Sequence, residues 1–297
     1  MNRSKFPAWF VRLAMRGQQL AGRLRGPPRG LACMFHTGRC GSSVLGELLD
    51  RHRRVFWDSE IVFKRQTLER APQGSIDLER LLRSRSAAAG GGVYGFELKF
   101  LPDQDPRNLT EPLGSLIDRF PSMGLDRCIV LRRRNHMRQL VSRLVGAERK
   151  SFHDLSGGGA GGGGGPTRVR LDTRRPFADS PDGHLSLVEM LDEHVERYAW
   201  LNDRLEAAGL PVLSLDFEDD ISGGPAAAAE RVFEFLGLGP SGVGAPRHRK
   251  TNPHPLADIL ENFDEVRDCL AGTPHAWMLE EQTERADAIA APGDAGR

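Results

Sequence analysis

Three absences limit what this chain can do. Its four cysteines are widely separated, with no CxxC pair and no metal-ligand cluster, so we expect reduced thiols and no metal site. No apolar run approaches the roughly 20 residues that span a bilayer, so we expect no transmembrane segment. The net charge is only +1 over 297 residues, which argues against a bulk nucleic-acid binder.

Carboxylates are also missing from the N-terminal segment, where the first acidic residue is Glu47. Residues 1–30 carry six arginines and one lysine and contain a Gly26-Pro27-Pro28 break. This basic N-terminal extension fits a frayed helix, a peripheral contact with an anionic membrane surface, or a transit peptide. We expect a cytoplasmic protein, with an organelle as the alternative location.

The remaining sequence is typical of one domain over 31–280 with a single interruption. Its hydrophobic content of 39% is enough for a substantial core. The glycine-rich run 156–165 has no side chains to bury, so we predict a flexible insertion there. Residues 281–297 are polar and alanine-rich, and we expect a disordered tail.

Strand-like runs alternate with helical patterns between these segments. The predicted strands are Leu31–Phe35, Val93–Phe100, Cys128–Arg132 and Pro211–Phe217. The predicted helices cover 42–52, 136–149, 185–208, 225–237 and about 255–271. This order predicts an α/β fold in which helices flank a central parallel sheet.

The most informative stretch runs from Phe35 to Leu49. An apolar run leads into a loop of small residues, and an amphipathic helical pattern follows. Successive backbone N–H groups and the positive end of a helix meet in such a loop, which makes an anion site. The Gly-Lys-Ser/Thr ending of a Walker A sequence is missing, and the cation lies inside the loop instead. The predicted anion-binding residues are Thr37, Gly38, Arg39, Cys40, Gly41, Ser42 and Ser43.

A second basic segment follows the strand predicted at Cys128–Arg132. The strand leads into three arginines, and Arg134 and the helical Ser142 can point at one phosphate. A guanidinium group offers a planar fork to phosphate oxygens, and a hydroxyl adds a donor. The alternative is a solvated basic face of the helix. Two such sites at strand ends of one sheet predict a ligand with separated phosphates.

Together these residues resemble the sulfotransferases that use 3′-phosphoadenosine 5′-phosphosulfate (PAPS). Thr37–Ser43 is similar to the 5′-phosphosulfate loop of that family. The stretch from Arg134 to Ser142 is similar to its 3′-phosphate motif, with Arg138 at the second arginine. Further similar segments are Ser59-Glu60, Tyr94–Lys99, Phe217–Asp220, Phe233–Leu238 and Arg249–Asn252.

The resemblance implies a P-loop-type three-layer fold and a reaction that needs no metal. The sulfuryl group of PAPS would pass by in-line displacement to a hydroxyl of a small molecule, carbohydrate or phenol, leaving 3′-phosphoadenosine 5′-phosphate (PAP). Arg39 and Lys99 would stabilise the developing charge, and Glu60 is the candidate general base. A histidine serves as base in other branches, so His36 and His52 are the substitutes.

The resemblance also implies a basic closing segment and leaves two departures to explain. Arg249 and Lys250 would close over the 3′-phosphate, although an exposed loop is the plainer interpretation. Cys40 replaces a serine of the first loop and can pack as a small residue. Asn135-His136 replaces the Asp-Pro pair of the second motif, which leaves open which arginine of 132–134 binds phosphate.

Two other classes of function remain open at this point. One is a P-loop NTPase or small-molecule kinase, which needs a loop lysine and a magnesium-holding carboxylate near the phosphates. The other is a non-catalytic member of the same fold that binds an anion, a glycan or a partner protein. Neither the acceptor nor the oligomeric state can be predicted from this sequence.

Overall fold

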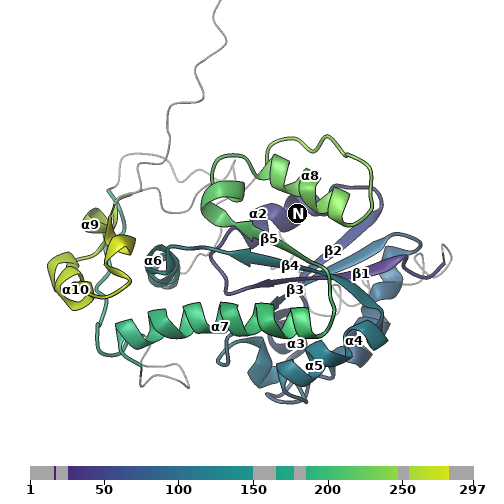
Figure 1. Cartoon of the computed structure of the whole chain (residues 1–297), viewed down its shortest axis with the longest axis horizontal. Helices are drawn as coiled ribbons and strands as arrows, with labels where there is room; N and C mark the ends of the chain where they lie inside the picture. Colours follow the sequence, from purple (N-terminus) through teal and green to yellow (C-terminus); the bar gives the residue numbers. More distant parts are fainter. Residues whose placement is uncertain (1–16, 18–25, 150–164, 177–184, 247–253, 281–297) are drawn as a thin grey trace, which may run out of the picture.

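A five-stranded sheet forms the centre of the computed structural model, which describes residues 17, 26–149, 165–176, 185–246 and 254–280. All the strand pairs are parallel, in the order β2-β3-β1-β4-β5 (Figure 1). The predicted α/β fold with a central parallel sheet is therefore confirmed. The strands are β1 (Gly30–His36), β2 (Val55–Glu60), β3 (Val93–Lys99), β4 (Leu125–Arg132) and β5 (Val212–Asp216).

Helices cover both faces of this sheet. Figure 1 shows α2 and α8 on one face, and α3, α4, α5 and α7 on the other. The helices are α2 (Ser42–Leu49), α3 (Ile61–Glu69), α4 (Leu78–Arg85), α5 (Leu113–Arg119), α6 (His136–Glu148), α7 (Leu187–Ala207), α8 (Pro225–Phe235), α9 (Leu256–Ile259) and α10 (Phe263–Leu270). Short helical turns are η2 (Ser86–Ala89), η3 (Asp105–Asn108), η4 (Pro121–Met123), the π-helical η5 (Phe217–Ile221) and η6 (Ala276–Leu279).

The central strand β1 explains why both faces are covered. Cys33 and Phe35 pack into the cluster formed with α3, α4, α5 and α7, whereas Ala32 and Met34 pack against α2 and α8. Every one of these side chains is fully buried. A strand that is apolar on both sides can be stable only between two layers of helices, which is the arrangement of parallel sheets.

A third apolar cluster lies beyond the carboxyl ends of the strands. It joins α6, the first half of α7, α9 and α10 through side chains such as Val141, Leu191 and Ile259. In Figure 1, α6, α9 and α10 stand at one end of the sheet, and α7 extends toward them from its own layer. This packing holds α6 next to the loop that follows β1.

Several boundaries differ from the predictions. The four predicted strands are present as β1, β3, β4 and β5, but β2 and the helices α3, α4 and α5 were not predicted. The single helix predicted at about 255–271 is wrong. Leu260 is extended and pairs with Val169, so the segment divides into α9 and α10.

Some predictions fall outside the described residues. They are most of the extension at 1–30, the glycine-rich insertion apart from Gly165, and the tail at 281–297. Among the described helices, none combines the length and the apolar character that crossing a bilayer needs.

Candidate functional site

The loop between β1 and α2 has a left-handed backbone at three positions. The φ angles are 85° at Gly38, 53° at Arg39 and 87° at Gly41. Gly41 is the N-cap of α2, and a side chain there would collide with Ile221. Because the first N–H groups of a helix have no partner within the helix, the tight loop presents free donors at this point. The N–H of Cys40 likewise makes no hydrogen bond with a described residue.

Arg39 joins this loop to α6. Its Nε and Nη2 atoms donate to the Oγ atom of Ser142 over 3.0 and 2.9 Å. Its own carbonyl oxygen accepts a hydrogen bond from Nη1 of Arg133 over 3.2 Å. Two segments that were predicted as separate anion sites therefore share one network.

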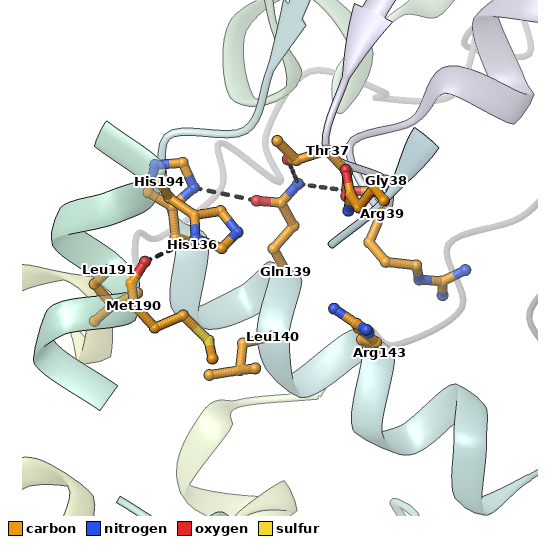
Figure 2. A pocket seen from close by; sticks show the side chains of 11 residues that line it. Thr37, Gly38, Arg39, His136, Gln139, Leu140, Arg143, Met190, Leu191 and His194 are labelled. Carbon is orange, nitrogen blue, oxygen red and sulfur yellow. Dashed lines mark hydrogen bonds between the residues drawn. The ribbon is translucent and has the colours of Figure 1, made fainter. Parts of the chain in front are cut away.

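Gln139 holds the loop from the side of α6, as Figure 2 shows. Its Nε2 atom donates to Oγ1 of Thr37 over 2.6 Å and to the carbonyl oxygen of Gly38. Gln104 donates to the carbonyl oxygen of Thr37 over 3.0 Å. Neither glutamine was singled out in the sequence, because no motif marks a residue that fixes a loop through its amide.

Lys99 and Glu60 lie together beside the loop. The Nζ atom of Lys99 is 2.8 Å from Oε2 of Glu60, and both side chains are about one quarter exposed. A register shift after Trp57 and a left-handed Ser59 turn the end of β2, so that Glu60 pairs with β3. A Cβ atom on Gly38 would lie 3.5 Å from Cε of Lys99. Glu60 and Lys99 thus lie together beside the loop that carries Arg39, whose own side chain contacts Ser142.

His36 forms the buried floor of this region. Its Nε2 atom is 3.2 Å from Oε2 of Glu97, whose other oxygen accepts from Nε1 of Trp57 over 2.8 Å. The N–H of Gly38 donates to Nδ1 of His36 over 3.0 Å, which fixes the neutral tautomer with its proton on Nε2. Burial lowers the pKa of His36, whereas contacts with Cys40 and Glu97 raise it; in this conformation the Gly38 N–H keeps Nδ1 unprotonated and the ring neutral. Protonation of His36 at Nδ1 would place two hydrogens against each other, because the Gly38 N–H already points at that atom. The imidazolium form therefore requires the backbone at Gly38 to rotate away.

One cluster has the composition of a metal site. Ligand atoms of His36, Glu60 and Glu97 lie within 4.8 Å of one another. However, Nδ1 of His36 accepts a backbone N–H, and Nε2 carries its proton toward Glu97, so neither nitrogen offers a lone pair. Lys99 already neutralises Glu60. The donor set therefore does not fit a metal ion.

The two histidines named as substitute bases occupy other surroundings. His36 is fully buried and bonded to Glu97. His52 packs against Phe233 with the ring centroids 4.7 Å apart and the rings tilted by 40°, in the layer of α2 and α8. Glu60 is the candidate base that is accessible beside Lys99.

The three arginines after β4 have different roles. Arg132 forms a bidentate salt bridge with Asp216, in which Nε and Nη2 donate over 2.8 and 3.2 Å. Arg134 donates to Asp219 over 2.6 Å rather than pointing at Ser142, which is held by Arg39. Arg134 and Ser142 thus have different side-chain partners here, and their joint contact with one phosphate stays a prediction.

Arg133 packs against the loop between β1 and α2, where it contacts the backbone of Arg39. Its side chain is only 12% exposed, and its guanidinium carbon stands 4.3 Å from the centroid of the Phe217 ring. Its Nε atom is buried without a hydrogen-bond partner among the described residues. Burial lowers its pKa to about 10, which leaves the group charged at neutral pH. Of the three arginines, this one supplies positive charge directly behind the loop.

The departures from the sulfotransferase motifs have structural explanations. Cys40 is fully buried in the α2–α8 cluster, as expected for a small packing residue. Asn135 caps α6 by accepting the N–H of Arg138 over 2.8 Å, so it fixes the turn in place of Asp-Pro. The carboxylate of Glu218 accepts the N–H groups of Arg134 and Asn135 over 3.0 and 3.1 Å. The predicted cofactor residues Arg249 and Lys250 lie outside the described residues.

A pocket lies between α6 and α7, against the same loop (Figure 2). Thr37, Gly38 and Arg39 of the loop line one part of it. The side walls are Gln104, His136, Gln139, Leu140, Arg143, Met190, Leu191 and His194.

The comparisons with known proteins support the fold. No protein-family model and no curated protein matches the sequence. The fold is similar to a solved structure of a sulfotransferase from Alicyclobacillus acidocaldarius. The TM-score is 0.50 with 13% sequence identity, over 85% of this chain and 94% of that chain. The chain therefore has a sulfotransferase-like α/β fold.

Proposed function

We propose that the chain is a sulfotransferase that moves the sulfuryl group of PAPS to a hydroxyl group of an acceptor. The observation that carries this proposal is the contact of Arg39 with Ser142. It joins the loop after β1 to α6, two segments that were expected to bind the two ends of one nucleotide. The likeness to a solved sulfotransferase supports the proposal at the level of the fold.

The residues present fit a doubly charged anionic ligand. Arg133 is a buried cation behind the loop, and its Nε atom lies 4.0 Å from the carboxylate of Glu218 without a hydrogen bond to a described residue. The loop itself presents free N–H groups. In this proposal the loop N–H groups and Arg39 hold the 5′-phosphosulfate, while Ser142 holds the 3′-phosphate. Arg134 joins Ser142 once the phosphate replaces the carboxylate of Asp219 as its partner.

The proposed reaction is an in-line displacement at sulfur. The acceptor oxygen forms a bond to sulfur while the bond from sulfur to the bridging phosphate oxygen breaks, so that PAP leaves with that electron pair. Glu60 takes the acceptor proton, and Lys99 stands where it can stabilise charge on the bridging oxygen.

PAP binding is the most direct test. We expect saturating PAP to raise the melting temperature and labelled PAPS to transfer its label to at least one member of a panel of alcohols, sugars and phenols. Failure of PAP to stabilise the protein would refute the proposal. Greater stabilisation by ATP with magnesium would favour a kinase, and PAP binding without turnover on any acceptor would favour a non-catalytic binding protein.

A further inference from the structure

The hydrogen bonds around the α6–α7 pocket fix the proton position on two of its histidines. The carbonyl oxygen of Gly38 can only accept, so the Gln139 atom that contacts it must be the amide nitrogen. The amide oxygen of Gln139 then faces Nδ1 of His136 over 3.1 Å. Because that oxygen can only accept, Nδ1 of His136 carries the proton, and Nε2 has a free lone pair.

His194 has the same arrangement by an independent contact. Its Nδ1 atom lies 2.8 Å from the carbonyl oxygen of Met190, which can only accept. The proton is therefore on Nδ1, and Nε2 has a free lone pair here too. Both rings line the pocket, with their centroids 5.2 Å apart.

Neither Nε2 atom makes a hydrogen bond within the described part of the chain. His194 is partly exposed and His136 is 4% exposed, and both residues line the pocket. Burial lowers the pKa of His136 to about 4, and it also lowers the pKa of His194. At neutral pH the pocket thus holds two uncharged acceptors that lack donors.

The remaining walls indicate the kind of ligand. Leu140, Met190 and Leu191 supply apolar surface next to the two imidazoles. Two cations line the pocket, and both have partners: Arg39 donates to Ser142, and Arg143 has the carboxylate of Asp103 near it. An anionic ligand would be repelled by the Nε2 lone pairs of the two histidines. A neutral alcohol can instead donate a hydrogen bond from its hydroxyl group to them.

We propose that this pocket binds a neutral, hydroxyl-bearing ligand with an apolar face, and that its O–H groups donate to Nε2 of His136 and His194. Gly38 and Arg39 line the pocket, so the ligand would lie beside the loop between β1 and α2. This inference rests on the proposed function in one respect, because it identifies the ligand with the sulfuryl acceptor. The binding itself needs no nucleotide.

The tautomers can be measured directly by long-range ¹H–¹⁵N NMR of the histidine rings. The structure assigns the Nδ1–H form to His136 and His194. His36 and His52 are internal controls of the opposite kind, because Nδ1 of each accepts a backbone N–H, from Gly38 and Arg54, over 3.0 and 3.1 Å. Observation of Nε2–H rings at His136 and His194 would overturn the proposal.

Ligand binding is tested with benzyl alcohol and benzoate, two probes that differ in charge. We expect benzyl alcohol to shift the Nε2 resonances of His136 and His194, and benzoate at equal concentration to leave them unchanged. His194→Phe keeps an aromatic ring but removes the acceptor, and it should weaken benzyl alcohol binding about tenfold, the effect of one hydrogen bond. His52→Phe is the matched control and should bind normally.

Each outcome separates the two proposals. Equal binding of both probes, or unchanged binding by His194→Phe, would overturn the histidine site even if PAP binds. Benzyl alcohol binding at the two rings without any PAP binding would support the site and refute the sulfotransferase function.

Discussion

The guanidinium group of Arg39 donates two hydrogen bonds to the hydroxyl of Ser142, 103 residues further along the chain. One residue lies in the loop after the central strand and the other on α6, so the contact spans the proposed nucleotide site. In the proposed complex, Arg39 would donate to the 5′-phosphosulfate and Ser142 to the 3′-phosphate of the same nucleotide. The structure thus links the two segments that are proposed to bind the nucleotide.

Substitution of these two residues should weaken PAP binding to different extents. Arg39→Ala removes a charged donor and should lower the affinity about 10- to 100-fold, whereas Ser142→Ala removes a neutral one and should lower it about fivefold. Arg39→Lys should fall between wild type and Arg39→Ala, because it keeps the charge but loses the fork. Calorimetric titration with PAP measures each affinity.

A double-mutant cycle tests whether the pair acts as a unit. Because the two side chains contact each other, the combined loss in Arg39→Ala/Ser142→Ala should differ from the sum of the single losses. Strict additivity would show that PAP does not bridge the two residues.

Glu60→Gln should lower turnover without weakening PAP binding. Glutamine keeps an oxygen that can accept from Lys99, so the local packing survives, but it cannot take a proton. We expect kcat to fall about 100- to 10,000-fold with the PAP affinity within a factor of two of wild type. Steady-state kinetics on the best acceptor of the panel measures both quantities.

Glu79 offers a matched control, because it pairs with Arg83 on the surface of α4. Glu79→Gln should turn over normally. If Glu60→Gln also kept wild-type turnover, another group would have to be the base.

The strand that carries Glu60 depends on a buried ion pair. Asp58 accepts from Nη2 of Arg85 and from the hydroxyl of Tyr94, each over 2.7 Å. Both charged side chains are less than 10% exposed. Arg85→Ala would leave this carboxylate buried with its main partner lost, at a cost of about 3 kcal/mol in the free energy of unfolding.

The neighbouring Arg83 is the control for this prediction. It lies in the same turn of α4 but is mostly exposed, so Arg83→Ala should change the stability by less than about 0.5 kcal/mol. Urea denaturation of the two variants measures the difference. Equal stabilities would show that the Asp58–Arg85 pair does not support β2.

The fold could be predicted largely from local patterns. β1, β3, β4 and β5 are apolar runs with turn residues at their ends, so their positions follow from the sequence alone. β2 includes Asp58 and Glu60, whose polar side chains hide its strand character. The carboxylate of Asp58 is compensated by Arg85, which comes from a distant helix, and no local pattern contains that information.

The site was predictable only in part, for a similar reason. The loop at 37–43, which is predicted to bind an anion, is a local motif and could be found from the spacing of its residues. The pairing of Arg39 with Ser142, and of Glu60 with Lys99, depends on the order of strands in the sheet. Arg134 was expected at the phosphate, but the nearby Asp219 competes for it, and such competition becomes visible only in three dimensions.

Asp105 provides a test of the electrostatics next to the site. It accepts the backbone N–H of Lys99 over 2.8 Å, and its carboxyl group is almost fully buried. Burial raises its pKa from 3.8 to about 7, against the lowering effect of Lys99. Because the folded pKa is above the unfolded one, the unfolded state releases this proton first. Asp105 therefore reduces the stability progressively as the pH rises from about 4 to about 7.

Asp105→Asn should abolish this part of the pH dependence, because asparagine keeps an oxygen for the Lys99 N–H but cannot ionise. We expect the variant to match wild type at pH 4 and to be more stable at pH 8, by at most about 4 kcal/mol. Urea denaturation at the two pH values measures the difference, with the exposed Asp203→Asn as control. A constant difference between variant and wild type at both pH values would contradict the assignment, since only a titrating carboxyl group makes that difference grow with pH.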